Sequence, residues 1–242
     1  MNNLNEKHKL NLLKSYQEVG KLIDERKDFL KEELESSRLL FNKNSLKNKK
    51  PIPIKVDVYA ILSGISFDKK TTQKITSIIT SIREILEGED FYFVKSKNLG
   101  IEFAILKWPK DKVNHKLIKE TESFLNQIKI PEFNLNILGI QLHTDGCIIL
   151  KGVDHGREIF NLRKELNFFL DNLPIKQSNW AHIPLGRILS PIGKEKMVAL
   201  KDKIRKLNLE LDFNILIDKV HLVHEKQWYM ENKRYILTKK LT

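Results

Sequence analysis

The chain has 242 residues, of which 41% are hydrophobic and 31% charged, which suits a soluble protein with one large domain or two small lobes. A membrane-spanning protein is excluded, because no apolar run approaches the ~20 residues that a transmembrane helix needs, and the amino terminus lacks the apolar segment of a secretory signal. Cys147 is the only cysteine, which excludes an intrachain disulfide and a thiolate zinc cluster, so we expect a cytoplasmic protein.

The net charge of +12 gives the chain a pI near 9.5. A basic surface attracts phosphates, and its binding to nucleic acid would weaken with salt. The same excess of lysine also fits a merely solvated surface. The charge therefore leaves both a polyanion-binding face and plain solvation open.

The first stretch, residues 4–46, is expected to form one long helix or a helical pair. Apolar residues recur there at three-to-four spacing with charges between them, namely Leu12, Tyr16, Val19, Ile23 and Leu30. The pattern fits an amphipathic helix packed on the following domain, and a partner helix or short coiled coil is the alternative. Residues 42–50 are polar and basic and end at two prolines, which predicts a linker. The expected domains are a helical extension with its basic linker over 1–50 and a second domain over 51–242.

From Ile54 onward the pattern alternates between strands and helices. The expected strands are 54–62, 91–94, 99–108, 133–142, 147–153, 178–189, 213–224 and 234–241. The expected helices are 75–86, 112–128, 159–170 and 194–207. Thr144-Asp145-Gly146 is expected to be a hairpin turn.

This order predicts an α+β fold with two lobes of antiparallel sheet and helices outside, preceded by the helical extension. The two halves of the chain show a similar order of elements, so the lobes are expected to be pseudo-duplicated. In that scheme, residues 99–105 of the first half correspond to residues 181–187 of the second.

The stretch around His182 has an unusual strand face. Alternation places His182, Pro184 and Gly186 on one side and apolar residues on the other. A face of this kind leaves room for a ligand to approach the imidazole. The same sequence also fits an edge strand in which His182 is hydrogen-bonded to a neighbouring residue. By the same alternation, Arg187 falls on the apolar side.

Several familiar catalytic motifs are missing from the sequence. It contains no phosphate-binding P-loop, no dinucleotide-binding glycine turn, no serine nucleophile elbow and no His-Glu-x-x-His run. His221 and His224 would face opposite sides of a strand and so make a poor metal pair. His143, at the hairpin turn, is open to a role as ligand or base, but turns also favour polar residues for backbone reasons. We therefore expect neither a metal nor a cofactor.

The segment Trp180–Ile188, Trp-Ala-His-Ile-Pro-Leu-Gly-Arg-Ile, resembles the second signature of the two-histidine (2H) phosphoesterases, the 2′,5′ RNA ligase-like and cyclic phosphodiesterase superfamily. That signature reads His, apolar, Thr or Ser, apolar, small, Arg, apolar. The carboxyl-terminal stretch from Ile217 to Leu237 and the order of elements also resemble the family. The resemblance covers roughly residues 54–240.

The resemblance implies two His-x-Thr/Ser motifs, one on each lobe, facing a cleft. One histidine would act as general base and the other would protonate the leaving oxygen, without a metal, while the two hydroxyls hold the phosphate. In this chain, Gly100 stands where the first histidine should be and Glu102 where the first hydroxyl should be. In the second motif His182 and Arg187 match, and Pro184 replaces the hydroxyl residue.

The resemblance thus implies a metal-independent cyclic phosphodiesterase whose activity is weakened by the loss of the first motif. It would bind or hydrolyse a cyclic or 2′,5′-linked phosphodiester of RNA or a nucleotide. His182 and Glu102 are the candidate catalytic residues, and Arg187, Gly100 and Pro184 are the candidate substrate-binding residues. Glu102 could also pair with His182 as an ion pair across the cleft. The alternative is a non-catalytic RNA- or protein-binding module on the same scaffold.

Overall fold

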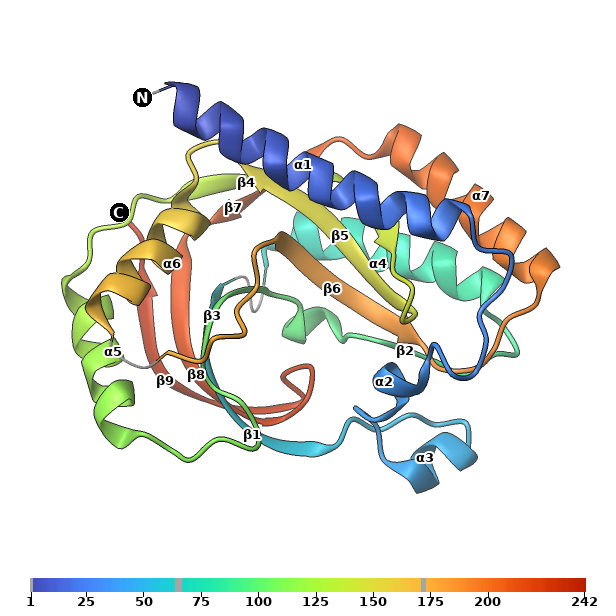
Figure 1. Cartoon of the computed structure of the whole chain (residues 1–242), viewed down its shortest axis with the longest axis horizontal. Coiled ribbons are helices and arrows are strands. Elements are labelled where there is room, and N and C mark those ends of the chain that lie inside the picture. The colour runs from blue at the N-terminus through green and yellow to red at the C-terminus, as the bar shows by residue number, and fades with distance from the viewer. Residues whose placement is uncertain (1, 64–66, 171–172) are drawn as a thin grey trace.

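The computed structural model describes residues 2–63, 67–170 and 173–242. It contains two antiparallel sheets with helices outside them, as Figure 1 shows. The fold is α+β, as the sequence predicts. Among the described residues, no helix combines the length and the apolar character needed to cross a membrane.

One sheet has four strands in the order β3-β1-β8-β9. Their bounds are β3 Ile101–Lys107, β1 Lys55–Ser63, β8 Lys219–Gln227 and β9 Asn232–Lys240. The other sheet has five strands in the order β2-β6-β5-β4-β7. Their bounds are β2 Phe91–Phe93, β6 Ala181–Ile188, β5 Cys147–Asp154, β4 Phe133–Leu142 and β7 Phe213–Ile217.

The two sheets do not correspond to the two halves of the chain. β2 belongs to the first half but pairs with β6 of the second, and β8 and β9 complete the sheet begun by β1 and β3. The sequence stretch 213–224, expected to be one strand, is therefore two. It breaks at Asp218, where β7 leaves the five-stranded sheet and β8 enters the four-stranded one. The alternation of apolar and polar residues does not indicate which sheet each part of this stretch joins.

The helices begin and end where local chemistry favours it. The long ones are α1 Asn2–Asp24, α4 Lys69–Ile85, α5 His115–Gln127, α6 Glu158–Phe169 and α7 Lys194–Glu210. The Asp68 side chain accepts the Thr71 N–H to cap α4, and the Asn114 side chain accepts the Leu117 N–H to cap α5. α4 buries a stripe of isoleucines, which fits the spacing read from the sequence. Helices α5 and α6 lie outside the four-stranded sheet, and α4 and α7 lie against the five-stranded one (Figure 1).

The amino-terminal stretch is not one continuous helix. α1 ends at Asp24, and two short helices follow, α2 Glu35–Arg38 and α3 Lys43–Lys47. Leu30, expected on the apolar stripe, is 54% exposed. Within the predicted linker, the Asn42 side chain caps α3. The 50/51 domain boundary stays a prediction.

α1 packs onto β4 and β5 of the five-stranded sheet, across the top of the view in Figure 1. Its Tyr16 hydroxyl donates to the carbonyl oxygens of Gly152 and Ala181, at 3.2 and 2.8 Å. The Gln141 side chain donates to the Tyr16 carbonyl at 3.0 Å. The side chains of Leu12, Tyr16 and Ile23 belong to the main hydrophobic core. The helix therefore covers part of a sheet face that carries His182 farther along.

A second, smaller hydrophobic cluster lies on the inner face of the four-stranded sheet. Its buried members are Val58, Ala60, Leu62, Ile105 and Val223. Trp108, Trp228 and Met230 pack against it while partly exposed. This apolar surface forms one wall of the space between the two sheets.

Candidate functional site

A cavity of about 520 Å³ lies between the two sheets. Strand β3 approaches strand β6 there, so residues about 80 positions apart in the sequence face one space. The five residues named as catalytic or substrate-binding candidates line it: Gly100, Glu102, His182, Pro184 and Arg187. The volume and the mixture of apolar walls with a few polar groups are typical of small-molecule sites.

Arg187 reaches the cavity because β6 contains a β-bulge. In the pairing with β5, Ile149 lies opposite Pro184 and Ile148 lies opposite Gly186, so Leu185 is an extra residue. A bulge shifts the alternation of faces by one. It brings Arg187 to the side of His182, and the expectation that Arg187 faces the apolar side was wrong.

Gly186 serves strand packing. It is buried and does not line the cavity. A Cβ atom on this residue would lie 2.2 Å from the carbonyl oxygen of Tyr92. Only glycine lets β2 approach β6 so closely. The expectation that Gly186 leaves room for a ligand was therefore wrong.

Strand β3 is irregular in the same way. Leu62 of β1 pairs with Glu102, whereas Ile61 pairs with Ala104, so Phe103 is extra. As a result, Ile105 shares the cavity side with Glu102. In a regular strand, Ala104 would lie on that side instead.

His182 is a neutral imidazole under physiological conditions. Burial lowers its pKa to about 3, with His143, Arg163 and Arg187 acting in the same direction. Its Nδ1 is buried and has no hydrogen-bond partner among the described residues. The expected ion pair with Glu102 is not formed. With so low a pKa the ring is a weak base at neutral pH, and it carries no extra proton to supply to a leaving group.

The other histidines do not provide a second imidazole in the cavity. His143 packs against Trp180 at 5.1 Å between ring centroids, outside the cavity lining. His224 Nε2 bonds to Asp57 at 2.6 Å, and its ring stacks on Tyr59. Among the described residues, His182 is therefore the one imidazole lining the cavity, and no group of three or more metal-ligating side chains is placed to hold a metal.

Arg187 is held firmly by protein groups. Its Nη1 donates to Asp145 Oδ2 and to Ser37 Oγ, each at 2.6 Å. Its Nε donates to the Tyr229 hydroxyl at 2.5 Å. Nη2 has no hydrogen-bond partner in the part of the chain that the structure describes. That nitrogen is the one available to an anion in the cavity.

Two carboxyl groups line the cavity from the four-stranded sheet. Burial raises the pKa of Glu102, and Arg163 partly offsets this. Burial raises the pKa of Glu225 to about 7, and the charge of Glu102 acts in the same direction. Glu225 Oε1 accepts the backbone N–H of Met230 at 2.9 Å. At neutral pH the Glu225 carboxyl is therefore protonated in part of the molecules and ionised in the rest.

Sequence reasoning missed Arg163, which ties the two walls together. Its Nε donates to the Phe103 carbonyl at 2.7 Å, and its Nη2 donates to the Glu102 and Trp180 carbonyls at 2.7 and 2.9 Å. It therefore joins β3 to the residue that precedes β6. The available signal was a charged residue on the apolar stripe of α6, four residues after Ile159.

Glu225 and Asn98 were also missed. Glu225 alternates with His221 and Val223 on one face of β8, so no apolar stripe marks it in the sequence. Asn98 lies in the short 3₁₀ helix η1, Ser96–Asn98, just before β3. Nothing in the sequence around Asn98 marks it.

No protein-family model matches the chain, and no curated protein matches it in sequence. Solved structures do match. TT0787 of Thermus thermophilus is 11% identical, with a TM-score of 0.55 over 76% of this chain and 97% of that one. ATU0111, a conserved protein of unknown function from Agrobacterium tumefaciens str. C58, is 17% identical, with a TM-score of 0.56 over 76% of this chain and 86% of that one. A looser match is E. coli LigT in its apo form, 16% identical, with a TM-score of 0.49 over 78% of this chain and 99% of that one. The first two establish a shared fold.

Proposed function

We propose that the chain is a 2H phosphoesterase-like protein whose cavity binds a cyclic or 2′,5′-linked phosphodiester of RNA or a nucleotide. One observation carries the proposal. The positions that correspond to both family motifs, Gly100 and Glu102 on β3 and His182 and Arg187 on β6, line a single cavity. β3 and β6 belong to different sheets and contact each other at this cavity, as the two-motif arrangement requires.

The residues present suit binding of a phosphodiester. Arg187 offers its free Nη2, and the ammonium of Lys176 lies at the cavity beside Trp108. The neutral His182 adds a ring nitrogen.

The hydrolytic reaction is expected to be weak. His182 is a weak base because burial lowers its pKa to about 3, Gly100 supplies no acid for the leaving oxygen, and Pro184 supplies no hydroxyl for the phosphate. A positioned acid or base contributes about 10²–10⁴-fold to a rate.

The non-catalytic binding module is favoured by one specific observation: among the described residues, two carboxyl groups and one imidazole line the cavity. In that case the cavity or the basic surface binds without turnover. If RNA is the ligand, its affinity should fall steeply between low and high salt, because each neutralised phosphate releases counterions.

The decisive experiment rebuilds the lost motifs. Wild type, His182→Ala and the triple variant Gly100→His, Glu102→Thr and Pro184→Thr are assayed for binding and hydrolysis of 2′,3′-cyclic nucleotides. We expect wild type to bind, hydrolysis by wild type to be at or little above that of His182→Ala, and the triple variant to gain about 10²-fold or more. Absence of binding by wild type to all four nucleotides would overturn the proposal. Turnover by wild type that His182→Ala abolishes would instead support the enzyme over the binder.

A further inference from the structure

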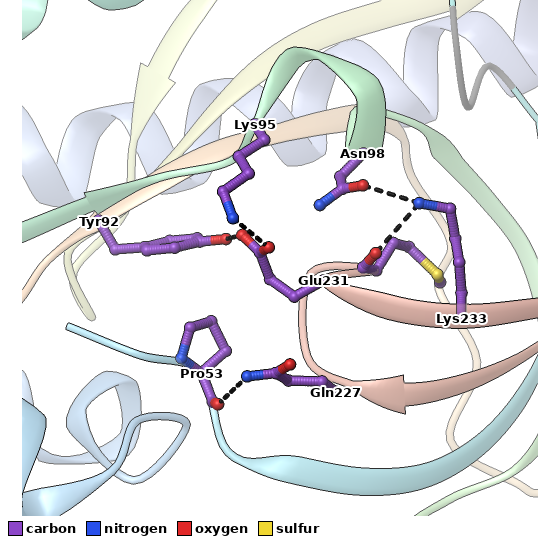
Figure 2. A network of polar contacts seen from close by, with 8 residues as sticks. Pro53, Tyr92, Lys95, Asn98, Gln227, Glu231 and Lys233 are labelled. Atoms are coloured by element: carbon purple, nitrogen blue, oxygen red, sulfur yellow. Dashed lines mark hydrogen bonds and ion pairs between the residues drawn. The ribbon is translucent and has the colours of Figure 1, made fainter.

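One end of the cavity lies beside the turn between β8 and β9, and two polar groups face it there. Asn98 is 4% exposed and Glu225 is also 4% exposed, and both line the cavity. Figure 2 shows Asn98 and its neighbours Lys233 and Glu231. Their bonding leaves a donor on Asn98 and an acceptor on Glu225 unused.

The orientation of the Asn98 amide follows from its partner. Lys233 Nζ donates to Asn98 Oδ1 at 2.7 Å, and an ammonium group can only donate. The other amide atom is therefore the nitrogen. This Nδ2 is buried and has no hydrogen-bond partner among the described residues. An unpaired buried donor costs about 1–3 kcal/mol, and because Asn98 lines the cavity, an acceptor on a bound ligand would remove this cost.

Glu225 is fixed relative to Asn98 through a continuous set of hydrogen bonds. Lys233 Nζ also donates to the Met230 carbonyl at 3.1 Å, and the Met230 N–H donates to Glu225 Oε1 at 2.9 Å. Both bonds involve a turn with positive φ at Tyr229 and Met230, 62° and 56°. Two successive residues with positive φ match the tight turn that joins twisted antiparallel strands, and this turn fixes the Met230 backbone against Glu225.

The walls around these groups are flat or adaptable. Trp228 and Met230 line the cavity and pack against the apolar cluster of the four-stranded sheet. Aromatic side chains stack on unpaired bases, and a thioether adapts to an aromatic ring. A planar ring system with a polar edge therefore fits this end of the cavity.

We propose that this end is a base-recognition subsite selective for guanine, a proposal that rests on the proposed function. Asn98 Nδ2 donates to the guanine O6, and the Glu225 carboxylate accepts from the adjacent N1–H and N2–H groups. Guanine presents an acceptor next to two donors on one edge. Adenine, cytosine and uracil each offer an acceptor for Asn98 beside only one donor group. Each of them therefore leaves one oxygen of the Glu225 carboxylate without a donor.

The test compares the affinities of the 2′,3′-cyclic nucleotides of the four bases, measured by calorimetry on the full chain. We expect wild type to bind the guanine nucleotide about tenfold or more tightly than the adenine one, the order of a good bidentate pair. Asn98→Asp keeps the acceptor for Lys233 but removes the donor. Glu225→Gln keeps the shape but presents one acceptor oxygen in place of two. Each should reduce the guanine preference to about threefold or less, with the adenine affinity changed by less than about threefold.

The control is Asn126→Asp, because Asn126 is exposed on α5 away from the cavity. It adds the same charge and should leave the preference unchanged. Circular dichroism checks that each variant is folded. If Asn98→Asp does not fold, the guanine preference of Glu225→Gln tests the proposal by itself.

The outcomes separate the two proposals. Equal binding of all four nucleotides would overturn the guanine subsite and leave the proposed function standing. A guanine preference that survives in both variants would place base recognition elsewhere and would also overturn it. Failure of every nucleotide to bind would overturn the proposed function itself.

Discussion

Ser37 and Arg187 lie 150 positions apart in the sequence, and Arg187 Nη1 donates to Ser37 Oγ at 2.6 Å. The Ser37 hydroxyl in turn donates to the Asp145 carbonyl. The amino-terminal segment therefore helps to hold the arginine of the His182 strand in place. This contact connects the stretch whose role the sequence leaves open with the candidate site.

Replacement of Ser37 by alanine should loosen Arg187. The variant leaves one donor of a largely buried guanidinium unpaired, so we expect the free energy of unfolding to fall by about 1–3 kcal/mol. Nucleotide affinity should fall as well, because Nη2 loses its fixed direction. Urea unfolding and calorimetry measure the two effects. Ser36→Ala, at the exposed neighbouring position, is the matched control, and equal behaviour of the two variants would contradict the positioning role.

The sequence predicted most of the fold because alternation and three-to-four spacing are local properties. The hairpin at Thr144-Asp145-Gly146 and the isoleucine stripe of α4 were both found in this way. The strand break at Asp218 could not be read, since it depends on which sheet each half joins. The end of α1 at Asp24 was missed because polar and apolar residues continue beyond it at helical spacing.

The sequence singled out five of the residues that line the cavity, but it gave no account of their geometry. The β-bulges at Leu185 and Phe103 decide which side chains face the cavity, and a bulge changes no residue type. Arg187 was assigned the wrong face for this reason. Glu225 of β8 and Asn98 of η1 line the same cavity, and their proximity depends on tertiary packing alone.

Replacement of His182 by leucine should stabilise the fold while impairing the site. The imidazole has an unpaired buried nitrogen, which costs about 1–3 kcal/mol, and leucine removes it. We expect the free energy of unfolding at pH 7 to rise by about 1 kcal/mol or more, together with a loss of nucleotide binding. His155→Leu, on an exposed histidine, should change stability by less than about 0.5 kcal/mol. Destabilisation by His182→Leu would mean that the ring makes a contact that leucine cannot replace.

The pH dependence of stability should contain two opposing contributions from the cavity. The pKa of His182 is about 3 in the folded chain and 6.5 in the unfolded one, so between these values the unfolded chain binds more protons and stability rises with pH. The pKa of Glu225 is about 7 when folded against 4.5 when unfolded, so between these values the folded chain binds more protons and stability falls as pH rises. The nearby charges are Arg163, Arg187 and His143 for His182, and Glu102 and Lys233 for Glu225.

The two contributions can be separated by difference. Relative to wild type, Glu225→Gln should gain stability as pH rises from about 4.5 to 7, because it lacks the carboxyl that loses its proton. The advantage of His182→Leu over wild type should shrink as pH rises from about 3 to 6.5. Urea unfolding at closely spaced pH values measures both differences. Differences that do not change with pH would show that neither group has the shifted pKa.

The turn between β8 and β9 is held over the cavity by Glu231, and a graded pair of variants should show this. Tyr92 donates its hydroxyl to Glu231 Oε1, and Lys95 donates to Oε2, each at 2.6 Å, as Figure 2 shows. Glu231→Gln keeps an acceptor for Tyr92 and weakens only the contact with a mostly exposed lysine, so the free energy of unfolding should fall by less than about 1 kcal/mol. Glu231→Ala leaves the buried Tyr92 hydroxyl without its acceptor and should cost about 1–3 kcal/mol. Because Trp228 and Met230 belong to the same turn, nucleotide affinity should follow the same order. Equal effects of glutamine and alanine would assign the stabilisation to the ion pair instead of the tyrosine.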